Sequence, residues 1–208
     1  QIEKDWFPQM EADVFISHSH ADEKLAKGLA GWLHSCFGLT CFIDSCVWGY
    51  ADDLLEMIND EYSDKKNKPS GGCIYDHKKC NTASKHVNTM LTIALYKMID
   101  KSEITILLNT NSSIKKYKDI YQQTTYSPWI YSEICLTNTM RQKKPARKSN
   151  VRLDESTQQL LIHYPIDISS FYPLSNHTLN IWCNIHSTYP EYNSMDILYQ
   201  IIDEYREQ

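Results

Sequence analysis

Three short apolar segments, set between longer segments of helical periodicity, constrain the fold of this chain more than any other feature. They are "ADVFIS" (12–17), "LTCFID" (39–44) and "SEITILLNT" (102–110), and all contain β-branched or aromatic residues. Such runs are typical of buried strands. Strands that alternate with helices predict a parallel sheet covered by helices on both faces, which is an α/β fold.

The expected helices have apolar residues at helical spacing. The first lies within residues 18–38, where Asp22 and Glu23 suit the first turn and Gly38 suits the stop. Further helices are expected at 51–62, 86–100, 128–140 and 193–208. The residues predicted to face the core are Leu25, Leu29, Trp32, Leu33 and Cys36, then Met90, Ile93, Ala94 and Met98, then Ile130, Ile134 and Thr137, and finally Ile197, Leu198, Ile201 and Ile202.

Residues 63–85 interrupt this pattern. The segment is polar and contains Gly and Pro, so we predict a loop insertion. Cys73, His77, Cys80 and His86 are residue types that a zinc site uses, but their spacing matches no familiar zinc finger. We therefore predict no metal site.

Two later segments lie between the last expected helices. "RQKKPARKSNVR" (141–152) is a basic loop, for which a solvated connector and a phosphate- or partner-binding loop both stay open. "QLLIHYPID" (159–167) contains the residues expected to form a fourth strand. With 208 residues, the chain suits one domain, 1–208, that carries the insertion at about 63–85.

Composition excludes some classes of function. The net charge of −5 provides no global attraction to nucleic acid or acidic membranes. There is no apolar run of the ~20 residues that a membrane span needs, and the first residues lack the apolar segment of a signal peptide. The seven cysteines are odd in number and irregular in spacing, so we expect reduced thiols and a cytoplasmic protein.

The expected helix at 128–140 places a carboxylate beside an indole. Ser127 suits the N-cap and Pro128 suits the first helical position. Trp129 and Glu133 then lie one turn apart on the same side. Because ligands bind at the carboxyl ends of the strands in open α/β sheets, the start of this helix and the loops 17–21 and 45–50 should share the functional edge. An ordinary surface pair is the alternative for the two side chains.

The segments "DVFISHSHADEKLAKGLAGWL", "CFID", "ITILLN" and "WIYSE" occur in this order between Asp13 and Glu133. Together they resemble a TIR domain of the NAD-cleaving type. The resemblance implies a flavodoxin-like parallel sheet with helices on both faces. The subgroup it indicates is a bacterial standalone TIR protein of antiphage defence, such as a Thoeris-type signal producer.

The resemblance also implies roles for particular residues. Glu133, the glutamate of the Trp-x-x-x-Glu motif, would be catalytic, and Trp129 would wall the pocket. Ser17, His18 and Ser19 would line the site from the loop after the first strand; their alternative role is to end that strand and cap the next helix.

The loop after the second strand, "SCVWGY" (45–50), would shape the pocket and join neighbouring protomers, with Trp48 and Gly49 as its binding residues. Trp48 could instead pack on the body of the protein. This loop is shorter than usual in the family and lacks the acidic residues often found there.

The implied activity is cleavage of the nicotinamide–ribose bond of NAD+, which acts as substrate rather than cofactor. Positive charge develops at the anomeric carbon in an oxocarbenium-like transition state, and a neighbouring carboxylate stabilises it. Hydrolysis, cyclisation and conjugation of the ADP-ribose share this first step. The expected partners are NAD+, a second copy of the chain, and a separate effector reached through a small-molecule product.

Two further functions stay open from the sequence. The first is a non-catalytic TIR–TIR interaction module, and the weaker one is a nucleoside-processing transferase with a similar sheet. The Trp-x-x-x-Glu spacing favours the enzyme.

Overall fold

The computed structural model describes residues 5–48, 51–68, 71–116, 123–140 and 164–206. Its elements, in chain order, are β1 (Val14–Ser17), η1 (His20–Asp22), α2 (Glu23–Phe37), β2 (Cys41–Phe42), α3 (Asp44–Val47), α4 (Ala51–Tyr62), β3 (Lys66–Asn67), β4 (Cys73–Ile74), α5 (His77–Lys101), β5 (Ile104–Leu107), β6 (Lys115–Lys116), β7 (Gln123–Thr125), α6 (Pro128–Thr139), β8 (Tyr164–Pro165), α7 (Asn176–Thr188) and α8 (Ser194–Arg206).

A parallel three-stranded sheet occupies the centre of the molecule. Its strand order is β2-β1-β5, so the first strand lies in the middle. Val14 pairs with Cys41 of β2 and with Ile104 of β5, and Ser17 pairs with Leu107. The predicted parallel sheet, its first three strands and the mixed α/β class are therefore confirmed.

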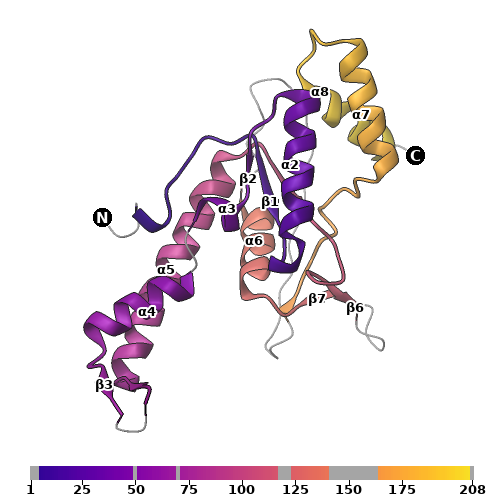
Figure 1. The fold of residues 1–208 in the computed structure, drawn as a ribbon. Helices are drawn as coiled ribbons and strands as arrows, with labels where there is room; N and C mark the ends of the chain where they lie inside the picture. Colours follow the sequence, from indigo (N-terminus) through magenta and orange to yellow (C-terminus); the bar gives the residue numbers. More distant parts are fainter. Residues whose placement is uncertain (1–4, 49–50, 69–70, 117–122, 141–163, 207–208) are drawn as a thin grey trace.

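Helices cover both faces of this sheet (Figure 1). Successive side chains of a strand point to opposite faces. Phe15 accordingly packs into a core cluster with α4 and α5, whereas Val14 and Ile16 pack into a second cluster with α2, α7 and α8. All four residues of β1 are buried, which explains their continuous apolar run.

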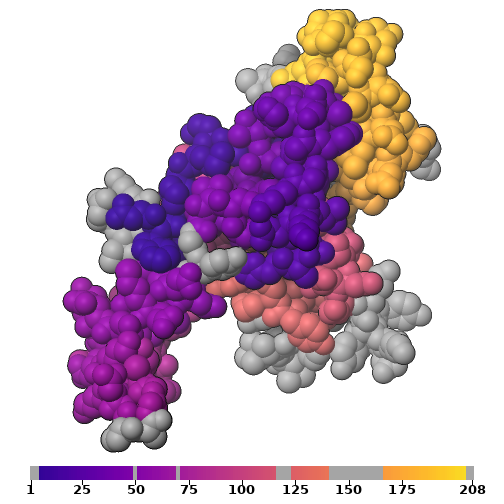
Figure 2. Space-filling model, viewed as in Figure 1, coloured from indigo at the N-terminus to yellow at the C-terminus, as the bar shows by residue number. Residues whose placement is uncertain are grey.

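An arm built from α4 and the first half of α5 projects away from the body (Figures 1 and 2). The antiparallel pair β3–β4 lies at its end. The prediction of a loop insertion at 63–85 is therefore wrong for 77–85, which is helical. Asp76 caps α5 by accepting a hydrogen bond from the Lys79 N–H at 2.9 Å. The helix expected at 86–100 therefore begins earlier, at His77, and its first turns were missed because they are polar, as suits an exposed arm.

The strand expected within 159–167 exists at Tyr164–Pro165, but it lies outside the central sheet. It pairs antiparallel with β7 in a separate sheet of order β6-β7-β8. The rest of that prediction, at 159–163, falls outside the described residues, as does the basic loop 141–152. Along the described stretches, no helix is long and apolar enough to cross a bilayer.

The helix signals read from the sequence were mostly correct. Gly38 ends α2 with a φ of 70°, and Ser127 caps α6 by accepting a hydrogen bond from the Ile130 N–H. Two predicted core residues are exposed instead, Leu25 by 53% and Ile93 by 43%. Helix α7 was not predicted, because its Asn, Thr, Ser and His residues have low helix propensity.

Candidate functional site

Glu133 joins α6 to the end of β1. The side chain lies in the second turn of α6, and the residue is only 3% exposed. Ser17, the last residue of β1, donates its hydroxyl to Glu133 Oε2 at 2.5 Å. The contact connects residues 116 positions apart in the chain. The contact therefore joins the loop after β1 to helix α6, two of the segments that were predicted to share a site.

His18 connects the same loop to the segment after β2. Its Nε2 lies 3.1 Å from Ser45 Oγ, and its Nδ1 lies 3.3 Å from the Ile16 carbonyl oxygen and 3.7 Å from Asp44 Oδ1. Both neighbours of Nδ1 are acceptors, so the network assigns a proton to Nδ1, while Nε2 shares a hydrogen bond with the Ser45 hydroxyl. His18 is thereby held in one orientation with a side chain only 2% exposed.

Two carboxyl groups influence each other in this site. Burial raises the pKa of Glu133 well above its ordinary value of 4.5, the charge of Asp44 raises it further, and the hydrogen bond from Ser17 lowers it. Burial also raises the pKa of Asp44, against the opposing effect of His18. The Asp44 side chain keeps 34% of its surface exposed, so Glu133 is the more strongly desolvated of the two. Raised carboxyl pKa values at the end of a strand are typical of functional sites.

Ser19 and Thr110 share Asp22 as a hydrogen-bond acceptor. The Ser19 hydroxyl donates to Asp22 Oδ2 at 2.5 Å, and the Thr110 hydroxyl donates to the same oxygen at 2.6 Å. Asp22 therefore fastens the loop after β1 to the loop after β5. Ser17 thus binds α6 and His18 binds the start of α3, whereas Ser19 binds Asp22, which in turn contacts the loop after β5.

The predicted aromatic residues have separate positions. Trp129 is half-buried against the core cluster that contains α5. Trp48 is buried, stacks edge-on with Phe7 and Phe42 at centroid distances of 5.4 and 5.0 Å, and donates its indole N–H to the Pro8 carbonyl at 2.9 Å. Trp48 thus packs on the body, the alternative that the sequence left open, and its role in binding stays a prediction.

The segment predicted as the 45–50 loop is partly helical. Residues 45–47 belong to the short helix α3, so the expected loop is wrong there. Gly49 lies outside the described residues.

Asp44 was missed as a site residue. From the sequence it was placed only at the end of the expected strand 39–44. A signal was available, because an acid that directly follows a strand shares the functional edge with Ser17. Asp22 was recognised only as a first-turn helix residue, and Thr110 only as the end of a strand.

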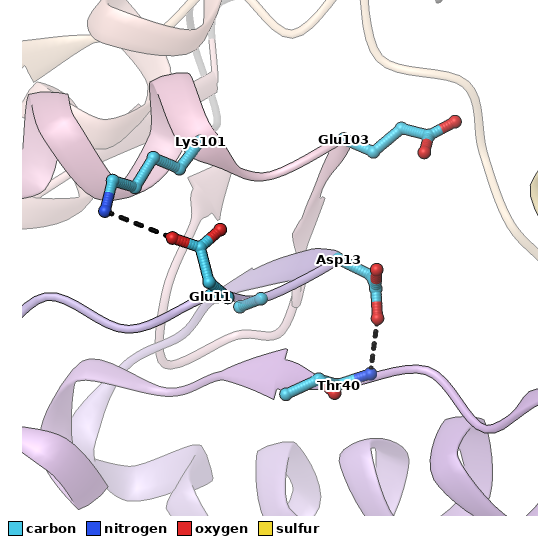
Figure 3. A pocket seen from close by; sticks show the side chains of 6 residues that line it. Glu11, Asp13, Thr40, Lys101 and Glu103 are labelled. Atoms are coloured by element: carbon cyan, nitrogen blue, oxygen red, sulfur yellow. Dashed lines mark hydrogen bonds and ion pairs between the residues drawn. The ribbon is translucent and has the colours of Figure 1, made fainter.

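Two hollows of the described surface lie away from Glu133. One, of about 220 Å³, is at the amino end of the sheet (Figure 3). There Glu11 pairs with Lys101, and Asp13 accepts a hydrogen bond from the Thr40 N–H at 2.7 Å. The other, of about 250 Å³, is a shallow depression on the outer side of α5 near Ile93. Glu133 itself is covered in this conformation.

The cysteines and histidines of the arm form no recognisable ligand set. Cys73 is exposed and contacts Asn67, while the His77 ring contacts Asn81. Within the ranges that the structure describes, no group of three or more His, Cys, Asp or Glu is arranged to hold a metal ion.

Comparison with known proteins identifies no relative: no protein-family model, no curated protein and no solved structure matches this chain.

Proposed function

We propose that this protein is a TIR-type enzyme that cleaves the nicotinamide–ribose bond of NAD+, with Glu133 as the catalytic carboxylate. One observation carries the proposal, the Ser17–Glu133 hydrogen bond of 2.5 Å at the carboxyl edge of the sheet. It links the two segments on which the TIR resemblance rests. The strand order β2-β1-β5 is compatible with the flavodoxin-like arrangement that we propose with it.

The physical role of Glu133 follows from its burial. A carboxylate with little solvent interacts strongly with positive charge, because water does not screen it. NAD+ carries a cationic pyridinium ring, and its bound charge would favour the ionised form of Glu133. As the glycosidic bond breaks, the charge moves to the anomeric carbon, where the same carboxylate stabilises it. Nicotinamide leaves as a neutral molecule, so this step needs no general acid.

The neighbouring groups would set the geometry of that carboxylate. Ser17 holds one oxygen of Glu133 and leaves the other for a ribose hydroxyl. Asp44, held near His18, adds negative charge at the same edge. Trp129 lies in the first turn of the helix that carries Glu133, and we propose that it packs against the substrate. Because Glu133 is 3% exposed, substrate entry requires a displacement of the groups that cover it.

We further propose that the product is an ADP-ribose-derived signal for a separate effector in antiphage defence, as the resemblance implies. A covered site excludes water and would favour another acceptor, either a group of the same molecule or a second metabolite. Self-association through the 45–50 region, cytoplasmic residence and the single-domain organisation belong to the same proposal.

The test is incubation of the full chain with NAD+, with chromatography for nicotinamide and mass spectrometry for the other product. We expect nicotinamide release by the wild type and a loss larger than ~10²-fold in Glu133→Gln. Glu56→Gln, a change on the exposed face of α4, is the matched control and should retain full activity. A folded Glu133→Gln variant with near-normal turnover would refute the catalytic assignment, and plain ADP-ribose as the only product would refute the signal.

A second candidate, the non-catalytic TIR–TIR interaction module, is favoured by one observation. Glu133 is buried and already hydrogen-bonded to Ser17, so its interactions are compatible with a purely structural role. This candidate predicts concentration-dependent self-association in sedimentation experiments and no nicotinamide release at any protein concentration. The enzyme predicts activity that rises faster than linearly with concentration, if a neighbour completes the pocket.

A further inference from the structure

Helix α7 is attached to α2 by an aromatic cluster. Trp182 of α7 is fully buried and stacks on Phe37 of α2, with ring centroids 4.0 Å apart and planes at 20°. Its indole N–H donates to the Ser194 carbonyl at 2.7 Å, which also fixes the start of α8. The relative position of α2 and α7 is therefore held by stacking on a buried indole, and the indole hydrogen bond links α7 to the start of α8.

Two cysteines meet beside this cluster. Cys36, in the last turn of α2, and Cys183, next to Trp182 on α7, have their Sγ atoms 3.0 Å apart. Both thiols are free and both side chains are partly exposed. A sulfur–sulfur bond is about 2.05 Å long, so its formation needs a movement of only about 1 Å. The stacked Phe37 and Trp182 rings are the chain neighbours of these cysteines and keep the two sulfurs close to each other.

We propose that peroxide oxidises the free thiols of Cys36 and Cys183 to a disulfide. This bond would fix α7 covalently to α2. One thiolate attacks a peroxide oxygen and becomes a sulfenic acid, while hydroxide leaves and takes up a proton. The other thiol sulfur then attacks the sulfenic sulfur, and water leaves. In total, two thiols and one hydrogen peroxide give one disulfide and two water molecules, so the thiols are oxidised and the peroxide is reduced.

The pKa of Cys36 limits its own reaction with peroxide. Burial, with a further contribution from Cys183, raises the pKa of Cys36 to about 11. The thiolate is the reactive form, so Cys36 should react slowly at neutral pH compared with a cysteine activated by a lowered pKa.

Cys41 provides a matched control. Burial raises its pKa to about 11 as well, so its thiol is similarly unreactive. Cys41 differs in having no sulfur contact like the one between Cys36 and Cys183 among the described cysteines. The proposed site thus differs from Cys41 in the proximity of a second sulfur and not in the pKa of the thiol. Comparison with Cys41 therefore tests whether proximity determines which cysteines are joined.

The cross-link would close a loop that spans 147 positions of the chain. Closing so long a loop removes entropy from the unfolded state, and for a chain of this length the expected rise in Tm is about 10 °C. Cys36 lies at the end of α2 far from the loop of Ser17 to Asp22. The proposal is therefore independent of the NAD-cleaving activity.

The experiment treats the full chain with hydrogen peroxide, blocks the remaining thiols under denaturing conditions and digests the protein without reductant. Mass spectrometry should find the Cys36 and Cys183 peptides joined, and calorimetry should show the rise in Tm, with both effects reversed by dithiothreitol. Cys36→Ser and Cys183→Ser should each abolish the joined peptide and the rise. Cys41→Ser should retain both.

Three outcomes would overturn the proposal. The first is oxidation of Cys36 and Cys183 to separate sulfinic acids with no joined peptide. The second is the joining of either cysteine to a different one. The third is a Cys36–Cys183 peptide without an increase in Tm, which would show that the bond does not lock the fold. The wild-type result decides among these even if one serine variant folds poorly.

Discussion

Replacing Glu133 with Gln should make the protein more stable at neutral pH and should have little effect at acidic pH. Glu133 is 3% exposed, and its pKa lies well above the ordinary 4.5 because of burial and the charge of Asp44. The folded state therefore keeps the proton when the unfolded state has lost it. Gln has nearly the same shape and can still accept the hydrogen bond from Ser17, but it carries no charge at any pH.

The sign and size of the effect follow from proton linkage. Because the folded-state pKa of Glu133 is raised, its contribution to stability is fully present below the unfolded-state value near 4.5 and is lost as pH rises through the folded-state value. Over that interval the wild type loses about 1.4 kcal/mol of unfolding free energy per pH unit for each such group. As pH rises, the unfolding free energy of Glu133→Gln should exceed that of the wild type by an amount that grows at this rate. The difference should then level off once pH passes the folded-state pKa of Glu133.

Urea unfolding followed by circular dichroism, from about pH 4 to about pH 8, would measure the difference between the two proteins. Subtracting the wild-type unfolding free energy from that of the variant at each pH removes the contribution of every group that titrates in the same way in both proteins. The same comparison should be repeated after Asp44→Asn has been introduced into both the wild type and the Glu133→Gln variant. Since the charge of Asp44 raises the pKa of Glu133, the difference should level off at a lower pH in that background. A difference that stays constant across the range, or a variant that loses stability relative to the wild type as pH rises, would refute the reasoning.

Two further predictions concern stability. Gly38→Ala should destabilise the protein by about 1 kcal/mol in urea unfolding, because Gly38 has a φ of 70°, which alanine adopts unfavourably. No neighbouring atom would meet the added Cβ, so the effect should come from the backbone conformation alone. The control Gly31→Ala, inside α2 with similar free space, should instead stabilise by roughly 0.5–1 kcal/mol, and the same sign in both variants would contradict the argument. Trp182→Ala should cost roughly 3–5 kcal/mol, since the residue is fully buried and hydrogen-bonded. Tyr62→Ala, at a residue 67% exposed, should change stability by less than about 0.5 kcal/mol, and equal effects of the two changes would contradict the assigned core.

Several features could be predicted from the sequence because they depend on neighbouring residues. The apolar runs predicted β1, β2 and β5, since a strand buried on both faces needs continuous apolar side chains. Ser127 with Pro128 predicted the start of α6, and Gly38 predicted the end of α2, because capping acts within one turn. The arrangement of the parallel sheet then predicted that Ser17 and Glu133 would lie at one edge.

Other features were decided only by the tertiary structure, because they depend on which distant segments pack together. Local pattern cannot show that Asp44 lies near enough to Glu133 to shift its pKa, that Trp48 fills the core beside Phe7, or that Cys36 meets Cys183. The final strand joined a separate sheet for the same reason, since strand pairing is set by the partners available and not by the strand's own residues. Burial, and with it the chemistry of each carboxyl and thiol group, arises from contacts between residues far apart in the chain.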